Sequence, residues 1–206
     1  MRHVLPDLAL ESEAATAFAL RVARAVDAAS RDPHEATFAR IATAVGKYWI
    51  CKRAPAFVNE AQECLGGAGY VEESILPRLY RQAPLNSIWE GSGNIQCLDV
   101  LRALSRESGT REAVAVELAS ASGRDAIYDA FVARLQDDLS SASEAGARML
   151  VERLALALQA AVLLRAGSPA AALFVRSRLG GAHGLAFGTL PGDADVGALL
   201  SRALPA

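Results

Sequence analysis

Apolar residues recur with the period of an α-helix along almost the whole chain. A first helix is predicted over about residues 7–30, and its apolar face is Ala15, Phe18, Ala19, Val22 and Val26. A second is predicted from about residue 33 to 65, with a stripe of Phe38, Ile41, Ala42, Val45 and Trp49. Asp32 followed by Pro33 is typical of a helix start, and Pro55 predicts a kink near Arg53.

Residues 66–91 have the least regular pattern. Helix-breaking residues are frequent there: Gly66, Gly67, Gly69, Pro77, Pro84 and Gly91. The glycine pair predicts the end of the second helix, and a short helix is predicted over Ile75–Gln82 with Ser74 as its cap. Ser92 then predicts the cap of another helix, with an apolar face of Cys97, Leu98, Leu101 and Leu104.

The second half of the chain is rich in alanine and has the same period. A helix is predicted from Thr110, and the next is marked by Ile127, Phe131, Leu135 and Leu139. Two more are predicted over Met149–Leu164 and from Ser168-Pro169 to Gly180-Gly181. Asp193 is predicted to cap a last helix. Because no segment alternates with period two, we predict an all-α fold. It is expected to be an antiparallel four-helix-bundle-like domain, residues 1–108, followed by an extra helical extension, residues 109–206.

Composition narrows the function classes. The chain of 206 residues is 52% hydrophobic and carries a net charge of −2, which excludes a disordered chain and a generic polycation. Three separated cysteines exclude a disulfide scaffold, and their spacing predicts no metal site. Acidic residues near the start exclude a signal peptide, and the longest apolar run, Leu154–Leu164, is too short for a membrane span. These features predict a cytoplasmic protein.

Two segments resemble common active-site motifs but lack residues that those motifs require. Gly67-Ala68-Gly69 lacks the third glycine of a dinucleotide-binding loop, and Glu90 replaces the first glycine of a nucleophile elbow. What remains is Gly66–Asn94, a glycine-rich segment with aromatic residues in which Glu90 precedes a helix N-terminus. A carboxylate is favoured there by the helix dipole, so Glu90 is either a dipole-matched surface residue or part of a binding site.

Three stretches of this region resemble the acyl-CoA dehydrogenase family. They are Glu63–Tyr70, Leu79–Ala83 and Ser87–Gln96, which stand in the same order and at similar spacing as in that family's carboxy-terminal helical domain. The adaptive-response (AidB-like) branch is the most similar, in Cys64–Tyr70 and Asn86–Val100. The resemblance covers residues 1 to about 105, and the rest looks like the extra helical tail of that branch.

The resemblance implies a flavoprotein that oxidises an acyl-CoA thioester between its α and β carbons. Glu90 matches the glutamate that removes the α proton while hydride passes to FAD. The implied FAD contacts near this base are Trp89, Gly91, Ser92, Gly93 and Asn94. Gly66 and Gly67 match the pair whose backbone approaches the adenine side of a neighbouring subunit's FAD.

Two departures limit what the resemblance implies. Glu63 stands where most members of the family have a glutamine that contacts the cofactor, and a carboxylate there would repel a pyrophosphate. The family's amino-terminal helical and middle β domains would precede this segment. We therefore expect a partial FAD site and no activity from the chain by itself.

Two other functions stay open. The adaptive-response branch is associated with the DNA alkylation response and with double-stranded DNA, which would bind through residues 110–206. This region has nine arginines and ten acidic residues, so binding would require a cluster such as Arg165, Arg176 and Arg178. The other function is an oligomerisation bundle: the family forms homo-oligomers through this domain, and residues 15–49 and 93–105 would supply the apolar faces.

Overall fold

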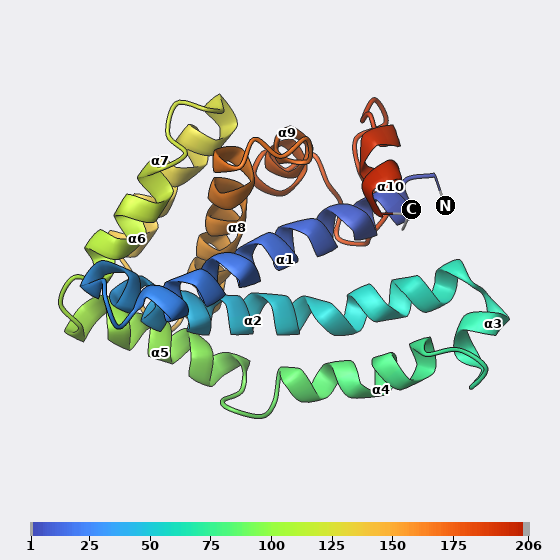
Figure 1. The fold of residues 1–206 in the computed structure, drawn as a ribbon, viewed down its shortest axis with the longest axis horizontal. Coiled ribbons are helices and arrows are strands. Elements are labelled where there is room, and N and C mark those ends of the chain that lie inside the picture. Colours follow the sequence, from blue (N-terminus) through green and yellow to red (C-terminus); the bar gives the residue numbers. More distant parts are fainter. Residues whose placement is uncertain (1, 204–206) are drawn as a thin grey trace.

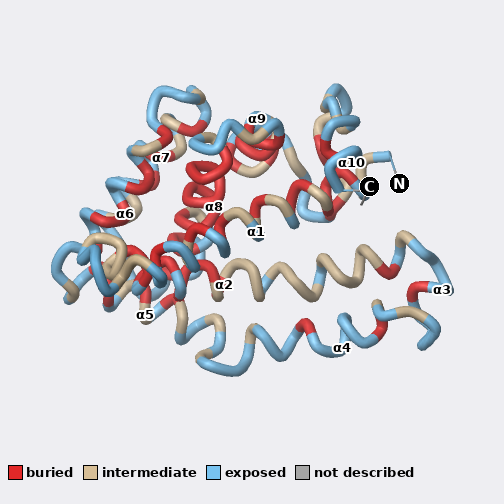
Figure 2. Tube along the Cα trace, viewed as in Figure 1, coloured by how far each residue is buried: buried red, intermediate tan, exposed pale blue. Residues whose placement is uncertain are grey.

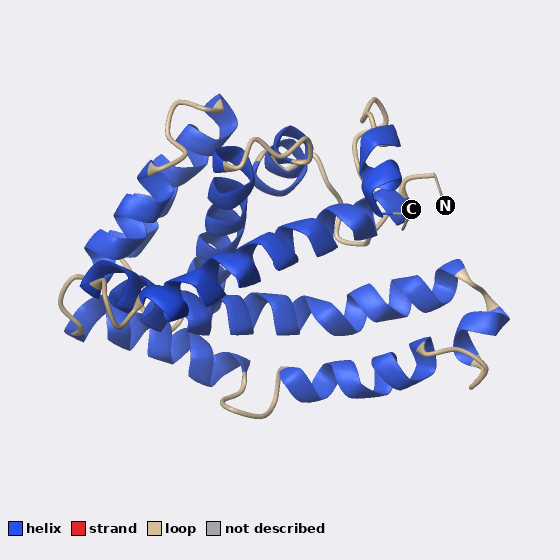
Figure 3. Cartoon of the chain, viewed as in Figure 1, coloured by secondary structure: helices blue, strands red, loops and turns tan. Residues whose placement is uncertain are grey.

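The computed structural model describes residues 2–203, and every regular element in that range is helical (Figures 1 and 3). The fold is therefore all-α, as predicted. The first five helices are α1 (Val4–Ala28), α2 (Pro33–Cys64), α3 (Gly67–Tyr70), α4 (Leu76–Asn86) and α5 (Gly93–Arg106). They are followed by α6 (Thr110–Ala119), α7 (Ala126–Ser140), α8 (Ala147–Arg165), α9 (Ala171–Phe174), a π-helical turn η1 (Val175–Leu179) and α10 (Gly197–Ala203).

The long helices α1 and α2 run antiparallel and pack along each other (Figure 1). Asp32 caps α2, because its carboxylate accepts hydrogen bonds from the N–H groups of His34 (2.9 Å) and Glu35 (3.4 Å). The α2 helix continues through Pro55 without a break and ends just before the predicted glycine pair. Its predicted apolar stripe is confirmed, since four of the five side chains are fully buried: Phe38, Ile41, Ala42 and Val45.

The predicted face of α1 is wrong for most of its residues. The buried face is Leu10, Ala14, Phe18, Arg21 and Ala25, whereas Val26 is 56% exposed. Arg21 is buried because its guanidinium pairs with Glu35 (2.7 Å) and Glu117 (2.8 Å) and lies over the ring of Phe38. A paired arginine in the middle of the buried stripe, together with alanines on every face, hides the phase of the helix from the sequence pattern.

The segment after α2 is more helical than predicted. Helix α3 is absent from the prediction, and α4 extends to Asn86 with Ile75, not Ser74, at its N-cap position. Proline near the start of α4 is compatible with a helix, because the first N–H groups have no partner within the helix. Gly69 lets α3 press against α2: a Cβ there would lie 2.2 Å from the carbonyl oxygen of Gln62.

The apolar face of α5 is confirmed only in part. Cys97 and Leu104 are buried, but Leu98 is 38% exposed, and Val100 is fully buried instead. The face of α7 is also confirmed only in part: Leu135 is buried as predicted, but Tyr128 and Val132 are buried in place of their neighbours Ile127 and Phe131. The side chain of Tyr128 turns inward because its hydroxyl donates a hydrogen bond of 2.7 Å to the carbonyl of Leu118.

Helix starts in the second half are mostly as predicted. Helix α6 begins at Thr110, and α8 contains the whole predicted range Met149–Leu164. The last helix is capped by Asp195, whose carboxylate accepts from the N–H of Gly197 (3.1 Å). The predicted cap, Asp193, lies four residues before the helix and pairs instead with Arg176.

Helix α8 is the centre of the fold. Thirteen of its 19 residues are buried, and it packs against α1, α2, α5, α6 and α7 (Figure 2). One apolar core therefore includes side chains from both halves of the chain. The predicted domain boundary at 108/109 lies in the short connection between α5 and α6, and this core continues across it.

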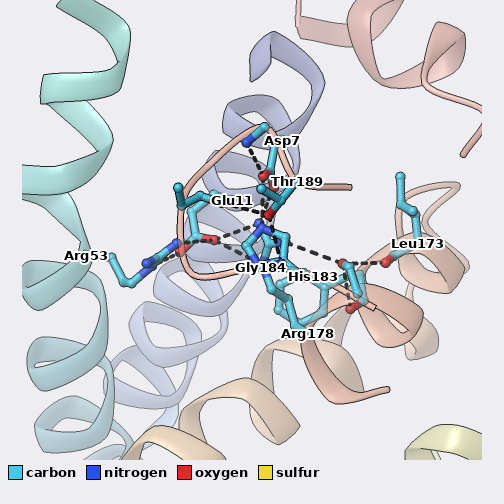
Figure 4. Close-up of polar contacts among 12 residues, drawn as sticks. Asp7, Glu11, Arg53, Leu173, Arg178, His183, Gly184 and Thr189 are labelled. Carbon is cyan, nitrogen blue, oxygen red and sulfur yellow. Dashed lines mark hydrogen bonds and ion pairs between the residues drawn. The ribbon is translucent and has the colours of Figure 1, made fainter. Parts of the chain in front are cut away.

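The segment after α9 is fastened to the start of α1 by a charged cluster (Figure 4). Asp7 is fully buried and accepts hydrogen bonds from Arg178, from the N–H of Gly188 (2.7 Å) and from the ring of His183 (3.0 Å between Oδ2 and Nε2). Burial raises the pKa of Asp7, but the hydrogen bonds from His183 and Arg178 and the charge of Arg178 outweigh it and hold the pKa below its ordinary value. The cluster thus tethers residues 178–188 to α1.

Candidate functional site

The loop between α4 and α5 has an unusual backbone at Glu90. Its φ is 53°, and among the described residues no other non-glycine residue has a positive φ. This left-handed conformation costs an L-amino acid about 1–3 kcal/mol. Gly91 follows with a φ of 97°, which glycine adopts without strain. The loop therefore turns sharply at the residue that the sequence singles out as the candidate base.

Two side chains hold this turn in place. Nζ of Lys47 donates to the carbonyl oxygens of Trp89 and Gly91, both at 2.5 Å. Nε2 of Gln96 donates to the carbonyl oxygens of Glu90 (2.9 Å) and Gly91 (3.3 Å). Three consecutive carbonyls are thus fixed by residues of α2 and α5, which compensates for the strained backbone.

The side chains of the turn face outward. Trp89 is 54% exposed, Ile88 is 62% exposed, and Glu90 is also exposed. Large apolar groups beside an exposed carboxylate form a surface that a flat or apolar ligand would cover.

The start of α5 also has polar groups that the helix itself does not use. Ser92 is at the N-cap position, as predicted, but its hydroxyl makes no capping hydrogen bond. Oδ1 of Asn94 accepts a hydrogen bond of 2.9 Å from Arg148 of α8. Gly93 lies against the ring of Tyr48, which a Cβ would approach to 3.4 Å.

The second predicted group, Gly66 and Gly67, lies at the opposite end of α4 (Figure 1). The whole of α4, 11 residues or about 16 Å of helix, lies between the two groups. The structure therefore does not bring them together into one site. An added Cβ on either glycine would meet no atom within 4 Å, so their backbone is open to a close approach from outside.

A hollow of about 470 Å³ lies beside the glycine pair. Tyr70 and Tyr80 line it, and Tyr70 is 80% exposed. Gln62 lines its inner wall and donates to the carbonyl of Gly69 (3.0 Å), and Arg81 at the rim pairs with Glu72 (2.5 Å). Nearby, Glu63 is exposed and accepts a hydrogen bond of 2.7 Å from Asn59.

The predicted basic cluster of the second half is not formed. Arg178 is buried in the cluster with Asp7 and Glu11, while Arg176 pairs with Asp193 and Arg165 pairs with Glu117 (3.2 Å). All three are neutralised because the fold places a carboxylate beside each guanidinium. The predicted oligomer faces are only partly available, because Phe18, Ile41 and Val100 are buried in the chain's own core, whereas Leu20, Val26 and Ile95 are exposed.

The cysteines and the potential metal ligands form no further candidate site in the described residues. All three cysteines are free, and burial raises the pKa of the Cys97 thiol to about 11, so it is not a thiolate at neutral pH. Within residues 2–203, no group of three or more His, Cys, Asp or Glu side chains is placed to hold a metal ion. No helix in the same range is long and apolar enough to cross a membrane.

Sequence reasoning missed Lys47, Gln96 and Arg148, which orient the loop and the start of α5. Lys47 could have been noticed in the sequence. It and Lys52 are the only lysines among 21 basic residues, so each departs from a strong preference for arginine. Gln96 stands at the end of the stretch Ser87–Gln96 that resembles the family, but its role in holding the turn was not predicted. Arg148 gave no signal, because its role depends on a tertiary contact.

Comparison with known proteins identifies the family. Residues 1–105, just over half of the chain, match the model of the acyl-CoA dehydrogenase carboxy-terminal domain. The chain belongs to the acyl-CoA dehydrogenase family. A putative acyl-CoA dehydrogenase, AidB, of Escherichia coli strain K12 is 47% identical over 82% of this chain and 31% of its own length. Acyl-CoA dehydrogenase family member 11 of Caenorhabditis elegans is 34% identical over 61% of this chain and 20% of its own length.

Solved structures agree with this assignment. The crystal structure of Caenorhabditis elegans ACDH-11 in complex with C11-CoA superposes with a TM-score of 0.72 at 26% identity. The match covers 81% of the present chain and 33% of the Caenorhabditis elegans chain. The chain thus spans about a third or less of the length of these relatives.

Proposed function

We propose that this chain forms one wall of the FAD and acyl-CoA site of an acyl-CoA dehydrogenase, with Glu90 as the base that removes the α proton. Membership of the family supports the reaction class. The left-handed backbone of Glu90 is the observation that favours this residue, because strain of this kind persists only where surrounding contacts impose it and is concentrated at functional sites.

The contacts of the turn support this role for Glu90. Lys47 and Gln96 fix the carbonyls on both sides of Glu90, so the carboxylate starts from a defined Cα position instead of a mobile loop. A positioned carboxylate can accept the α proton of a thioester. FAD, when bound, supplies the acceptor for the hydride that leaves the β carbon.

The surroundings of Glu90 fit a ligand that excludes water. Trp89 and Ile88 present apolar surface beside it. An acyl chain and cofactor lying there would exclude water from the carboxylate and so raise its pKa. The hydroxyl of Ser92 and the amide nitrogen of Asn94 are available for polar contacts to FAD, and Gly91 and Gly93 keep the backbone accessible. These residues fit the cofactor as a partial site.

We further propose that Gly66 and Gly67 contact the adenine side of a different FAD, held mainly by a neighbouring copy in a homo-oligomer. Their open backbone and their distance from Glu90 support this division. The exposed rings of Tyr70 and Tyr80 offer stacking surface beside them. The carboxylate of Glu63 is oriented toward Asn59, whose amide donates a hydrogen bond of 2.7 Å to it.

The chain is incomplete as an enzyme in this proposal, and its three free cysteines fit the reducing cytoplasm that we propose as its location. In the test, this chain is fused to the C-terminal end of the upstream part of the related E. coli protein. The fused protein is expected to bind FAD and oxidise acyl-CoA, whereas Glu90→Gln is expected to keep the visible flavin absorbance and lose about 10²–10⁴-fold in turnover. Equal turnover of the two proteins would contradict the role of Glu90.

Double-stranded DNA is a second candidate partner, favoured by a hollow of about 600 Å³ between α5, α6 and the α7–α8 connection. Arg102, Arg106, Arg111 and one carboxylate, that of Glu144, line it. Arg102 also lies 3.8 Å from Asp99, and Arg111 donates to the carbonyls of Leu104 and Leu139. A duplex phosphate would meet these guanidinium groups. Retention of a labelled duplex should fall steeply with salt, and Arg106→Gln should reduce that slope by about 0.9 where Arg134→Gln on α7 does not. Retention that is insensitive to salt would exclude this partner.

A further inference from the structure

A pocket of about 180 Å³ lies between α1, α2 and α8, on the part of α2 that follows Lys47. Its walls are mostly apolar and include Ala15, Ile50, Ala54 and Phe57. This volume slightly exceeds that of a cavity that holds benzene, about 150 Å³. The pocket is separate from the turn at Glu90, and none of its lining residues belongs to the candidate FAD or acyl-CoA site.

Two polar side chains line this apolar pocket from different helices. Gln159 is 2% exposed in the middle of α8, where its neighbours along the helix are buried leucines and alanines. Nε1 of Trp49, on α2, is buried without a hydrogen-bond partner. A buried polar group without a partner costs about 1–3 kcal/mol, and native proteins retain such groups where a ligand or an ordered water satisfies them.

The charged residues at the pocket are already neutralised. Nε of Arg53 donates to Glu11 at 2.9 Å, and Glu11 also pairs with Arg178 (3.1 Å), which in turn holds Asp7 (Figure 4). Two buried carboxylates thus face two guanidinium groups. A charged ligand would find no unpaired counter-charge at the pocket, so a neutral one is favoured.

The pocket walls are held in place from outside by the segment that follows η1. Phe187 packs edge-on against Phe57, with ring centroids 6.0 Å apart, and the guanidinium of Arg53 lies 4.4 Å from the ring of Phe187. The guanidinium of Arg53 also lies 5.6 Å from the ring of Trp49. A pocket with fixed walls loses little conformational entropy when a ligand enters.

We propose that this pocket binds a small neutral molecule with an apolar body and one hydroxyl group, of the class of phenols and short cyclic alcohols. The apolar body fits against Phe57, Ile50 and the alanines. The hydroxyl satisfies Gln159 in both directions, because its oxygen accepts from the amide nitrogen and its proton is donated to the amide oxygen. The amide thereby distinguishes a hydroxylated ring from the corresponding hydrocarbon.

Ligand-observed fluorine NMR on the 206-residue chain tests this proposal with 4-fluorophenol and fluorobenzene as probes. We expect saturable binding of 4-fluorophenol to one site. Gln159→Leu keeps a side chain of similar size and removes the hydrogen bonds, so it should weaken 4-fluorophenol binding by roughly three- to tenfold without weakening fluorobenzene binding. Gln136→Leu, an exposed glutamine on α7, is the matched control and should change neither.

A second variant tests the location of the site. Ala54→Leu adds three carbons to the pocket wall and should weaken both probes, since either ring needs this volume. Three results would overturn the proposal: no saturable binding, equal binding of 4-fluorophenol to the parent chain and to Gln159→Leu, or undiminished binding to Ala54→Leu. The first result would mean that water alone satisfies Gln159.

Discussion

Replacing Glu90 by glycine tests whether its backbone is strained for function. With a φ of 53°, Glu90 occupies a conformation that costs an L-residue about 1–2 kcal/mol and costs glycine almost nothing. Glycine also makes the unfolded chain more flexible, which lowers the free energy of unfolding by about 0.4–1 kcal/mol. Because Glu90 is exposed, no packing is lost with its side chain. Glu90→Gly should therefore raise the free energy of unfolding by about 0.5–1 kcal/mol.

For a chain of this size, that gain corresponds to an increase in Tm of about 2–3 °C, which calorimetry resolves. Glu73→Gly is the matched control, since Glu73 is exposed, lies in a turn and has no positive φ. There the same substitution should lower Tm, because only the entropy of the unfolded chain changes. Glu90→Ala keeps a Cβ and should not raise Tm. A fall in Tm for Glu90→Gly equal to that of Glu73→Gly would refute the claim of backbone strain.

Three further predictions concern the contacts around the site and the core. Asp7→Asn should lower the free energy of unfolding by about 3 kcal/mol at neutral pH, because Arg178 loses one of its two buried counter-charges and keeps only Glu11. The folded-state pKa of Asp7 is lowered, so its contribution is present above about pH 4 and is lost as the pH falls below that; denaturant titrations of parent and variant should converge in acid, and a constant difference would contradict the pairing. Lys47→Met should cost about 1–2 kcal/mol by the same assay and increase amide exchange in the Glu90 turn, and unchanged exchange would show that Lys47 does not hold it. Gly69→Ala should cost about 1–3 kcal/mol, since its Cβ would lie 2.2 Å from a carbonyl oxygen, and an unchanged Tm would contradict that contact.

Most helix positions were predictable because the chain's capping residues and apolar stripes agree with each other. Asp32-Pro33 and Thr110 mark real helix starts, and the stripe from Phe38 to Val45 is fully buried. The phase of α1 and α7 was not predictable, because Arg21 and Tyr128 are buried through polar contacts with other helices. Alanine-rich helices carry apolar surface all around, so such contacts decide which face turns inward.

The candidate base was found from sequence, but what holds it was not. Glu90 stands out by its position before a helix and by the resemblance of the surrounding turn to the family. Its left-handed backbone follows from Lys47, which lies 43 residues earlier on another helix. The loss of the predicted arginine cluster has the same origin, since partners such as Asp7 and Glu117 are distant in sequence from the arginines they neutralise.

The central claim is that Glu90 removes the α proton, and hydrogen exchange at that carbon tests it most directly. The substrate is an acyl-CoA analogue with sulfur in place of the β carbon, which can lose its α proton but no hydride. It is incubated in heavy water with the protein fused to the upstream part of the E. coli relative. The account predicts rapid exchange in the parent protein and a rate about 10²–10⁴-fold lower for Glu90→Gln with FAD still bound. Undiminished exchange in that flavin-containing variant would show that another group is the base.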